Sequence, residues 1–205
     1  MVKKPGRISA KDAGPLNGHV YWDPLPTARR LVAAQDRDPF QGKWDERKAR
    51  NVPGPFYTAD TDSMQTGRLD APGHVAYDED IGDGFGYEFV YRQPANETET
   101  AALVSAANME LYSGYAWDGD EHWTVETVRD WWRGRGEIHE WAVDLAAVWA
   151  ANAHPKYHGH YHDAARGLRE FVGFIDNGLG AYLRGYMFWL AEHCDPRPGQ
   201  SLPEL

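Results

Sequence analysis

The chain changes its pattern near residue 95, and this change limits the possible folds more than any other feature of the sequence. Between residues 51 and 86, Gly, Pro and Asp dominate, which favours loops and short strands. From Asn96 onwards, apolar residues recur every three or four positions, which is typical of amphipathic helices. The sequence therefore predicts an α+β fold, with a small antiparallel sheet in the first half and a helix-rich second half.

The clearest strand lies at 85–92, where alternation places one face at Phe85, Tyr87, Phe89 and Tyr91. A short helix is expected over 27–35, and residues 44–50 are expected to be irregular or helical. Asn96, with Glu99 three residues later, predicts the start of a helix. One face of that helix carries Leu103, Ala107 and Leu111.

Thr124 predicts the start of the next helix, and the strongest amphipathic pattern follows it. That pattern consists of Ile138, Trp141, Ala142, Leu145, Val148 and Trp149. Trp141, Leu145 and Trp149 form one stripe, which we expect the final helix to cover through Leu183, Met187 and Leu190. The alternative is that this stripe is an interface. The final helix is expected to end before Asp195-Pro196.

The length and composition fit a single globular domain over residues 1–205. Hydrophobic residues make up 42% of the 205 residues and charged residues 25%, as in an ordinary folded protein. Residues 1–20 are rich in Lys, Gly and Pro and are expected to form a loosely ordered N-terminal arm.

Several features predict a cytoplasmic protein. Cys194 is the single cysteine, so no internal disulfide can form. The first residues are charged but are not followed by an apolar stretch, unlike a signal peptide. The sequence also lacks a run of about 18 apolar residues, so no membrane span is expected.

Charge is distributed unevenly along the chain. Residues 1–50 carry 11 Lys and Arg against 6 Asp and Glu, whereas residues 51–130 carry 3 against 16, a net charge of −13. Such a segment repels nucleic acid and membrane phosphates, so neither is an expected partner. It attracts a basic protein surface or a cation. The alternative is an acidic surface that keeps the protein soluble.

Four of the nine histidines lie at His154, His158, His160 and His162. In an extended segment the last three would project to one side, as a Zn, Ni or Cu site requires. Asp163 is the only adjacent carboxylate, and no nearby Cys supplies a further ligand for such a site. A polar loop between helices is therefore the preferred interpretation, and we expect no metal and no cofactor.

Two acidic turns stand out in the first half of the sequence. The turn that begins at Asp78 does not match a calcium loop, because position 6 is Asp83 and position 12 is Phe89. The turn from Asp118 to Trp123 contains carboxylates, an imidazole and an indole. It could support acid–base chemistry or hold a cation, but a structural turn with carboxylates exposed to a partner is favoured.

The usual catalytic signatures do not occur in the sequence. These include the nucleophile elbow, the phosphate-binding loop, the dinucleotide fingerprint and the zinc-protease motif. Cys194 next to His193 is a weak dyad, because adjacent residues on a helix do not face each other. An enzyme is therefore not the expected class.

Several strings between residues 51 and 133 are similar to those of a known group of proteins. They are NVPGPFYTADTD from Asn51, EFVYRQP from Glu88, GYAWDGDEHWT from Gly114, and the pair Trp131-Trp132. The chain thereby resembles small acidic bacterial immunity proteins, which neutralise secreted polymorphic toxins. The resemblance implies that the protein blocks a cognate toxin by binding it, and it implies no catalytic residues.

The sequence thus favours an immunity or antitoxin-like inhibitor, whose partner is a toxin with a basic surface. The alternatives are a metal-dependent enzyme that uses the His154–His162 cluster and an assembly protein that forms an oligomer. The expected partner-binding residues are acidic, with one aromatic anchor: Asp60, Asp62, Asp78, Glu79, Asp80, Trp117, Asp118, Asp120 and Glu121.

Overall fold

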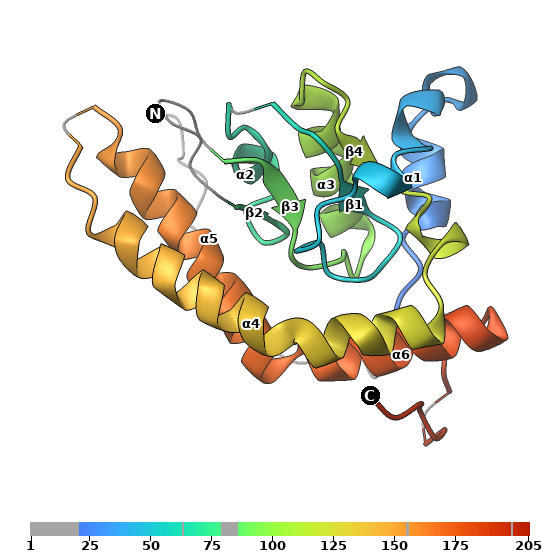
Figure 1. The fold of residues 1–205 in the computed structure, drawn as a ribbon. Coiled ribbons are helices and arrows are strands. Elements are labelled where there is room, and N and C mark those ends of the chain that lie inside the picture. The colour runs from blue at the N-terminus through green and yellow to red at the C-terminus, as the bar shows by residue number, and fades with distance from the viewer. Residues whose placement is uncertain (1–20, 63, 79–85, 155, 198) are drawn as a thin grey trace, which may run out of the picture.

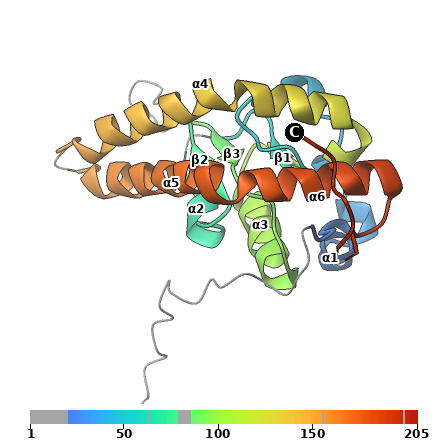
Figure 2. The ribbon, with the colours of Figure 1, turned by 90° about the horizontal axis from the view of Figure 1, so that it is seen from below.

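A layer of three long helices lies along one side of the molecule, and the loop-rich first half packs against it (Figures 1 and 2). The computed structural model describes residues 21–62, 64–78, 86–154, 156–197 and 199–205. The long helix α4 (Val125–Ala150) runs beside α6 (Leu179–Glu192) over its first half and beside α5 (His158–Asn177) over its second. This arrangement confirms the predicted α+β class and the helix-rich second half.

The β structure consists of two small antiparallel sheets with two strands each. In one, β1 (Tyr57–Thr58) pairs with β4 (Tyr115–Ala116); in the other, β2 (Val75–Tyr77) pairs with β3 (Glu88–Val90). The predicted strand at 85–92 is therefore present but shorter. Isolated two-stranded sheets are marginal in water, so the first half must obtain its stability from other contacts.

Buried amide side chains supply part of that stability. The Asn51 side chain accepts hydrogen bonds from the backbone N–H groups of Thr58 (3.1 Å) and Val90 (2.9 Å), and it donates to the carbonyls of Lys48 and Thr58. The Gln93 side chain binds the backbone of Phe56 in the same way: it accepts from the Phe56 N–H and donates to the Phe56 carbonyl. These side chains satisfy backbone groups that have no strand partner.

The helices of the first half are short, apart from one. They are α1 (Leu25–Leu31), α2 (Gly67–Asp70) and α3 (Glu97–Met109), with 3-10 turns at Ala34–Asp36, Asp38–Phe40 and Trp44–Glu46. The helix expected at 27–35 begins two residues earlier, because proline in the first turn favours helix initiation. It also ends earlier, where the Arg37 side chain donates to the Val32 carbonyl (2.9 Å).

The predicted helix starts at Asn96 and Thr124 are confirmed. The Asn96 side chain accepts from the Glu99 N–H (2.9 Å), whereas the Glu99 carboxylate binds Ala95, one residue before the expected partner. Thr124 and Thr127 form a capping box at the start of α4. The expected position of Leu111 on the face of α3 is wrong, because the helix ends at Met109 and Leu111 is 70% exposed.

The stripe on α4 is covered differently from the prediction. Trp141 lies against Phe89 of β3, with ring centroids 6.0 Å apart, and Phe89 in turn contacts Phe171 of α5. Strand β3 therefore contacts Trp141, where the prediction placed the final helix, and α5 lies on the other side of Phe89. Trp149 is buried as expected, but Val148 is 64% exposed and does not belong to the core.

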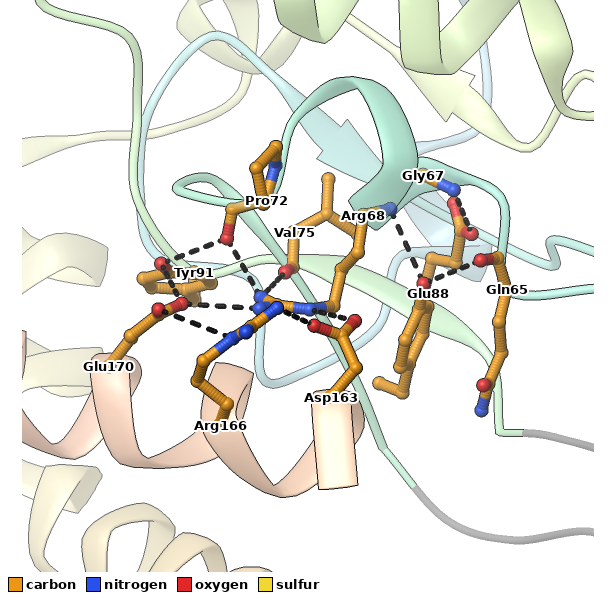
Figure 3. A network of polar contacts seen from close by, with 11 residues as sticks. Gln65, Gly67, Arg68, Pro72, Val75, Glu88, Tyr91, Asp163, Arg166 and Glu170 are labelled. Carbon is orange, nitrogen blue, oxygen red and sulfur yellow. Dashed lines mark hydrogen bonds and ion pairs between the residues drawn. The ribbon is translucent and has the colours of Figure 1, made fainter. Parts of the chain in front are cut away.

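One buried arginine joins the first half to α5 (Figure 3). The Arg68 side chain, which is 1% exposed, binds the carboxylates of Asp163 (3.0 Å) and Glu170 (3.2 Å). It also donates to the carbonyls of Pro72 (2.7 Å) and Val75 (2.8 Å) beside β2. A single guanidinium thus links α2, the approach to β2 and helix α5.

Within the described residues, no helix is long and apolar enough to cross a membrane.

Candidate functional site

A pocket of about 350 Å³ opens between α1, the turn at residues 117–121 and the last helix, α6. Its charged and aromatic lining is Asp23, Arg29, Arg37, Trp117, Asp118, Asp120, Glu121 and Trp189. Four of these residues were predicted from the sequence as partner-binding: Trp117, Asp118, Asp120 and Glu121. The pocket therefore gathers the second acidic turn together with residues from both ends of the described chain.

Asp120 carries the most unusual group in this pocket. It lies in a 3-10 turn at Gly119–Glu121, and its Oδ1 accepts a hydrogen bond from the Tyr186 hydroxyl (2.7 Å). Its Oδ2 is buried and has no hydrogen-bond partner in the part of the chain that the structure describes. Burial raises the pKa of Asp120 to about 7, although the Tyr186 hydrogen bond opposes this.

The position of Asp120 depends on a close backbone approach at Gly119. The Gly119 N–H donates to the Pro55 carbonyl (3.0 Å). A Cβ at Gly119 would lie 2.2 Å from the Gly54 carbonyl oxygen, so any other residue would push the turn away. Asp118 fixes the same turn, because its carboxylate accepts from the Gly42 N–H (2.7 Å) and the Tyr57 hydroxyl (2.7 Å).

An aromatic wall lies behind Asp120. The Tyr21 ring contacts Tyr182, Tyr186 and Trp189, with centroids 5.5 to 6.1 Å apart. Tyr21 is only 3% exposed, and its hydroxyl is a second buried group without a hydrogen-bond partner in the described residues. Burial and then the charge of Asp120 raise the pKa of Tyr21 well above its ordinary value, so the hydroxyl keeps its proton and can donate it.

The mouth of the pocket contains charges of both signs. Asp23 accepts from the Leu25 N–H (2.9 Å), and burial raises its pKa. Arg29 lies on the exposed side of α1, and its positive charge lowers the pKa values of Asp23 and Asp120. This compensation is incomplete, because the pKa of Asp120 is still about 7.

Trp117 forms one side of the pocket, with little of its ring exposed. It stacks on Phe40, with centroids 4.3 Å apart and planes 10° apart, and it is 3% exposed. It therefore supports the pocket more than it projects from the surface.

Three of the other predicted acidic residues are described and do not line this pocket. Asp60 is exposed and forms an ion pair with Lys48 (2.6 Å). Asp62 is buried and binds backbone N–H groups, and Asp78 is buried beside Arg50 (3.5 Å). Glu79 and Asp80 lie outside the described residues. The negative charge of residues 51–130 is thus partly internal, since several of its carboxylates hold loops in place.

The sequence did not reveal the other half of the site. Asp23, Arg29, Tyr186 and Trp189 lie on α1, on the segment before it, or on α6, far in the sequence from Asp120. None of them belongs to a local motif, so only the fold brings them together.

The His-rich segment is not the predicted loop. His158, His160 and His162 lie in the first turns of α5, where residues two apart are rotated by about 200°, so His160 and His162 do not share a side. His154 precedes the helix, and its Nδ1 accepts from the N–H groups of Lys156 and Tyr157 (3.2 Å each). In the described ranges, no group of three or more His, Cys, Asp or Glu side chains is arranged to hold a metal ion.

Cys194 lies just beyond α6 and is exposed.

The chain matches no protein-family model, no curated protein and no solved structure.

Proposed function

We propose that this protein is a binding protein of the immunity type, which inhibits a protein toxin by receiving one of its basic side chains in the pocket at Asp120. The observation that carries the proposal is the buried Oδ2 of Asp120, which lacks a hydrogen-bond partner among the described residues. A buried carboxylate whose counter-charge is incomplete is unfavourable, and its raised pKa reflects that cost. A cation that enters the pocket would supply the missing charge and hydrogen bonds.

The other pocket residues favour an arginine or a lysine as that cation. Trp117 and Trp189 both line the pocket, and aromatic surfaces attract guanidinium and ammonium groups. Asp23, Asp118 and Glu121 add further carboxylates to the lining, beside the guanidiniums of Arg29 and Arg37. Four carboxylates outnumber the two guanidiniums in this pocket of about 350 Å³, and with its two indoles it suits a single long basic side chain better than a neutral one.

The overall charge would favour the encounter with such a partner. The formal net charge is −10, and residues 51–130 carry −13. Long-range attraction between this chain and a basic toxin surface would speed association, whereas the buried contacts in the pocket would determine how long the complex lasts.

A second candidate function is general acid–base catalysis. A carboxyl group with a pKa of about 7 in a pocket is the kind of group that such enzymes use. The two functions differ in one respect: a binding pocket needs the ionised carboxylate alone, whereas an acid–base catalyst must pass through both protonation states. An activity whose rate depends on pH in a bell-shaped manner, and which is lost in Asp120→Asn, would favour the enzyme.

The proposal can be tested with a small mimic of the basic side chain. N-acetyl-arginine amide should bind with a dissociation constant of about 1 mM and shift the backbone amide NMR signals of residues 117–121. Its uncharged analogue, N-acetyl-citrulline amide, should bind at least about tenfold more weakly. Since the mimic binds the carboxylate form, its affinity should rise as the pH increases through about 7, the pKa of Asp120.

Asp120→Asn should weaken binding of the arginine mimic about tenfold or more and remove this pH dependence. Glu126→Gln is the matched control, because Glu126 is an exposed acid at the start of α4 and does not line the pocket. If the citrulline analogue binds as well as the arginine analogue, or if Asp120→Asn binds like the control, the pocket is not a receptor for a basic side chain.

A further inference from the structure

Most of the large apolar side chains that the described chain exposes lie in one region, along the junction of α2 and the end of α3. Five of the eight such residues belong to it: Met64, Leu69, Met109, Leu111 and Tyr112. We call this set the apolar seam. Single exposed apolar residues are common on protein surfaces, whereas a concentration of them marks an interaction site.

Hydrogen bonds join the segments that carry the seam. One carboxylate, that of Asp62, accepts from the N–H groups of both Met64 (2.8 Å) and Leu111 (2.9 Å), so these two loops lie side by side. Next to Leu69, the Asp70 carboxylate accepts from the Ser105 hydroxyl (2.7 Å) and joins α2 to α3. Ser105 and Met109 are four residues apart on α3 and share one face.

The two loops that display the seam are held rigidly. Glu110 is buried, and its carboxylate accepts from the N–H groups of Asp62 (2.6 Å), Tyr112 (2.9 Å) and Gly114 (2.5 Å). Gln65 and Ser113, which adjoin Met64 and Tyr112, have positive φ angles of 58° and 55°. This left-handed conformation is unfavourable for a non-glycine residue, and such positions concentrate at functional sites.

We propose that the apolar seam is a docking surface for an amphipathic segment of another protein, with an apolar face flanked by Lys or Arg. The charge around the seam selects this partner. Asp70 is exposed at its edge, and residues 51–130, which contain the seam, carry a net charge of −13. A second copy of this chain would bring the same negative charges face to face, which is unfavourable. Two methionines provide an adaptable apolar surface, and a fixed backbone reduces the entropy lost on binding.

The seam is separate from the Asp120 pocket and shares no lining residue with it, so this proposal does not rest on the proposed function.

Methionine methyl groups provide the readout. The chain has four methionines, of which Met64 and Met109 lie in the seam and Met187 is buried in the core. The protein, labelled with ¹³C at its methionine methyl groups, is titrated with a short helical peptide of Leu and Lys that has one apolar face. A second peptide carries Glu in place of Lys. The Leu–Lys peptide should shift the Met64 and Met109 signals and leave Met187 unchanged, whereas the Leu–Glu peptide should bind at least about tenfold more weakly.

Variants then locate the binding surface. Tyr112→Asp should weaken binding of the Leu–Lys peptide about tenfold or more, and it should not unfold the protein because Tyr112 is 72% exposed. Val148→Asp is the matched control, because Val148 is 64% exposed but lies on α4, and it should change affinity less than about twofold. Asp120→Asn should bind the peptide as wild type does, which separates this site from the pocket.

Three results would overturn the proposal. The first is equal affinity for the two peptides, and the second is the same loss of affinity in Val148→Asp as in Tyr112→Asp. The third is a dimer, seen by sedimentation, that Tyr112→Asp dissociates, because the seam would then be a contact between copies of this chain.

Discussion

Glu88 shows how strongly a single carboxyl group in the first half is constrained. It is fully buried, and its two oxygens accept from the Gly67 N–H (2.7 Å) and the Tyr115 hydroxyl (2.5 Å). Burial nevertheless raises its pKa from 4.5 to about 7. Below pH 4.5 the group is protonated in both the folded and the unfolded chain. Between pH 4.5 and about 7, the folded state holds the proton more tightly than the unfolded state, so its stability falls as the pH rises.

Glu88→Gln should remove this dependence, because glutamine can occupy the same site without a charge. We expect the free energy of unfolding of wild type to fall relative to that of the variant between pH 4.5 and about 7, by about 3 kcal/mol. Urea denaturation of both proteins across this range gives the difference directly. A constant difference across the range would mean that Glu88 keeps an ordinary pKa.

The contact between α5 and the first half depends on the polar side chains of Arg68, Asp163 and Glu170. The sequence does not show that these three side chains meet. Asp163 was predicted only as a carboxylate near the histidines, yet it binds Arg68, which lies 95 residues earlier. Gly167 allows the approach, because a Cβ there would lie 2.5 Å from an Arg68 nitrogen. Helix periodicity predicts which residues of α5 are apolar, but it does not show which element they meet.

Arg68→Met should destabilise the protein by about 3–5 kcal/mol, since it leaves the carbonyls of Pro72 and Val75 without their donor and removes the buried partner of two carboxylates. Arg166→Met provides the matched comparison (Figure 3). Arg166 contacts the same two carboxylates, but its side chain is 61% exposed, so its loss should cost less than about 1 kcal/mol. Urea denaturation measures both. Equal losses would show that the buried arginine has no special role.

The whole molecule depends on contacts between its two halves, and this explains which parts of the fold the sequence could predict. The class, the caps at Asn96 and Thr124 and the final helix follow local rules, so they were predicted. The contact of Trp141 with Phe89 depends on long-range packing, and so does the hydrogen bond between Asp120 and Tyr186. No local sequence pattern predicts either of them. Within the pocket, the acidic turn had a sequence signal, whereas the residues of α1 and α6 had none.

Trp141→Ala should destabilise the entire molecule, not one half. The Trp141 ring contacts Phe89, and the Arg50 guanidinium lies 3.9 Å from its centroid, so both halves lose contacts. We expect a loss of about 3 kcal/mol and a single unfolding transition. Far-ultraviolet circular dichroism follows the helices, and near-ultraviolet circular dichroism follows the aromatic packing. Should the two signals be lost at different denaturant concentrations, the chain has more than one cooperative unit.

The hydrogen bond between Asp120 and Tyr186 also has a consequence for biosynthesis. A ribosome produces the chain from its N-terminus, so Asp120 is made 66 residues before the hydroxyl that binds it. Tyr21 is made earlier still, and its ring packs against Tyr186 and Trp189 of the same final helix. At about 5–20 residues per second, several seconds separate the synthesis of Asp120 from that of Tyr186. The nascent chain therefore cannot complete the pocket until α6 has left the ribosomal tunnel.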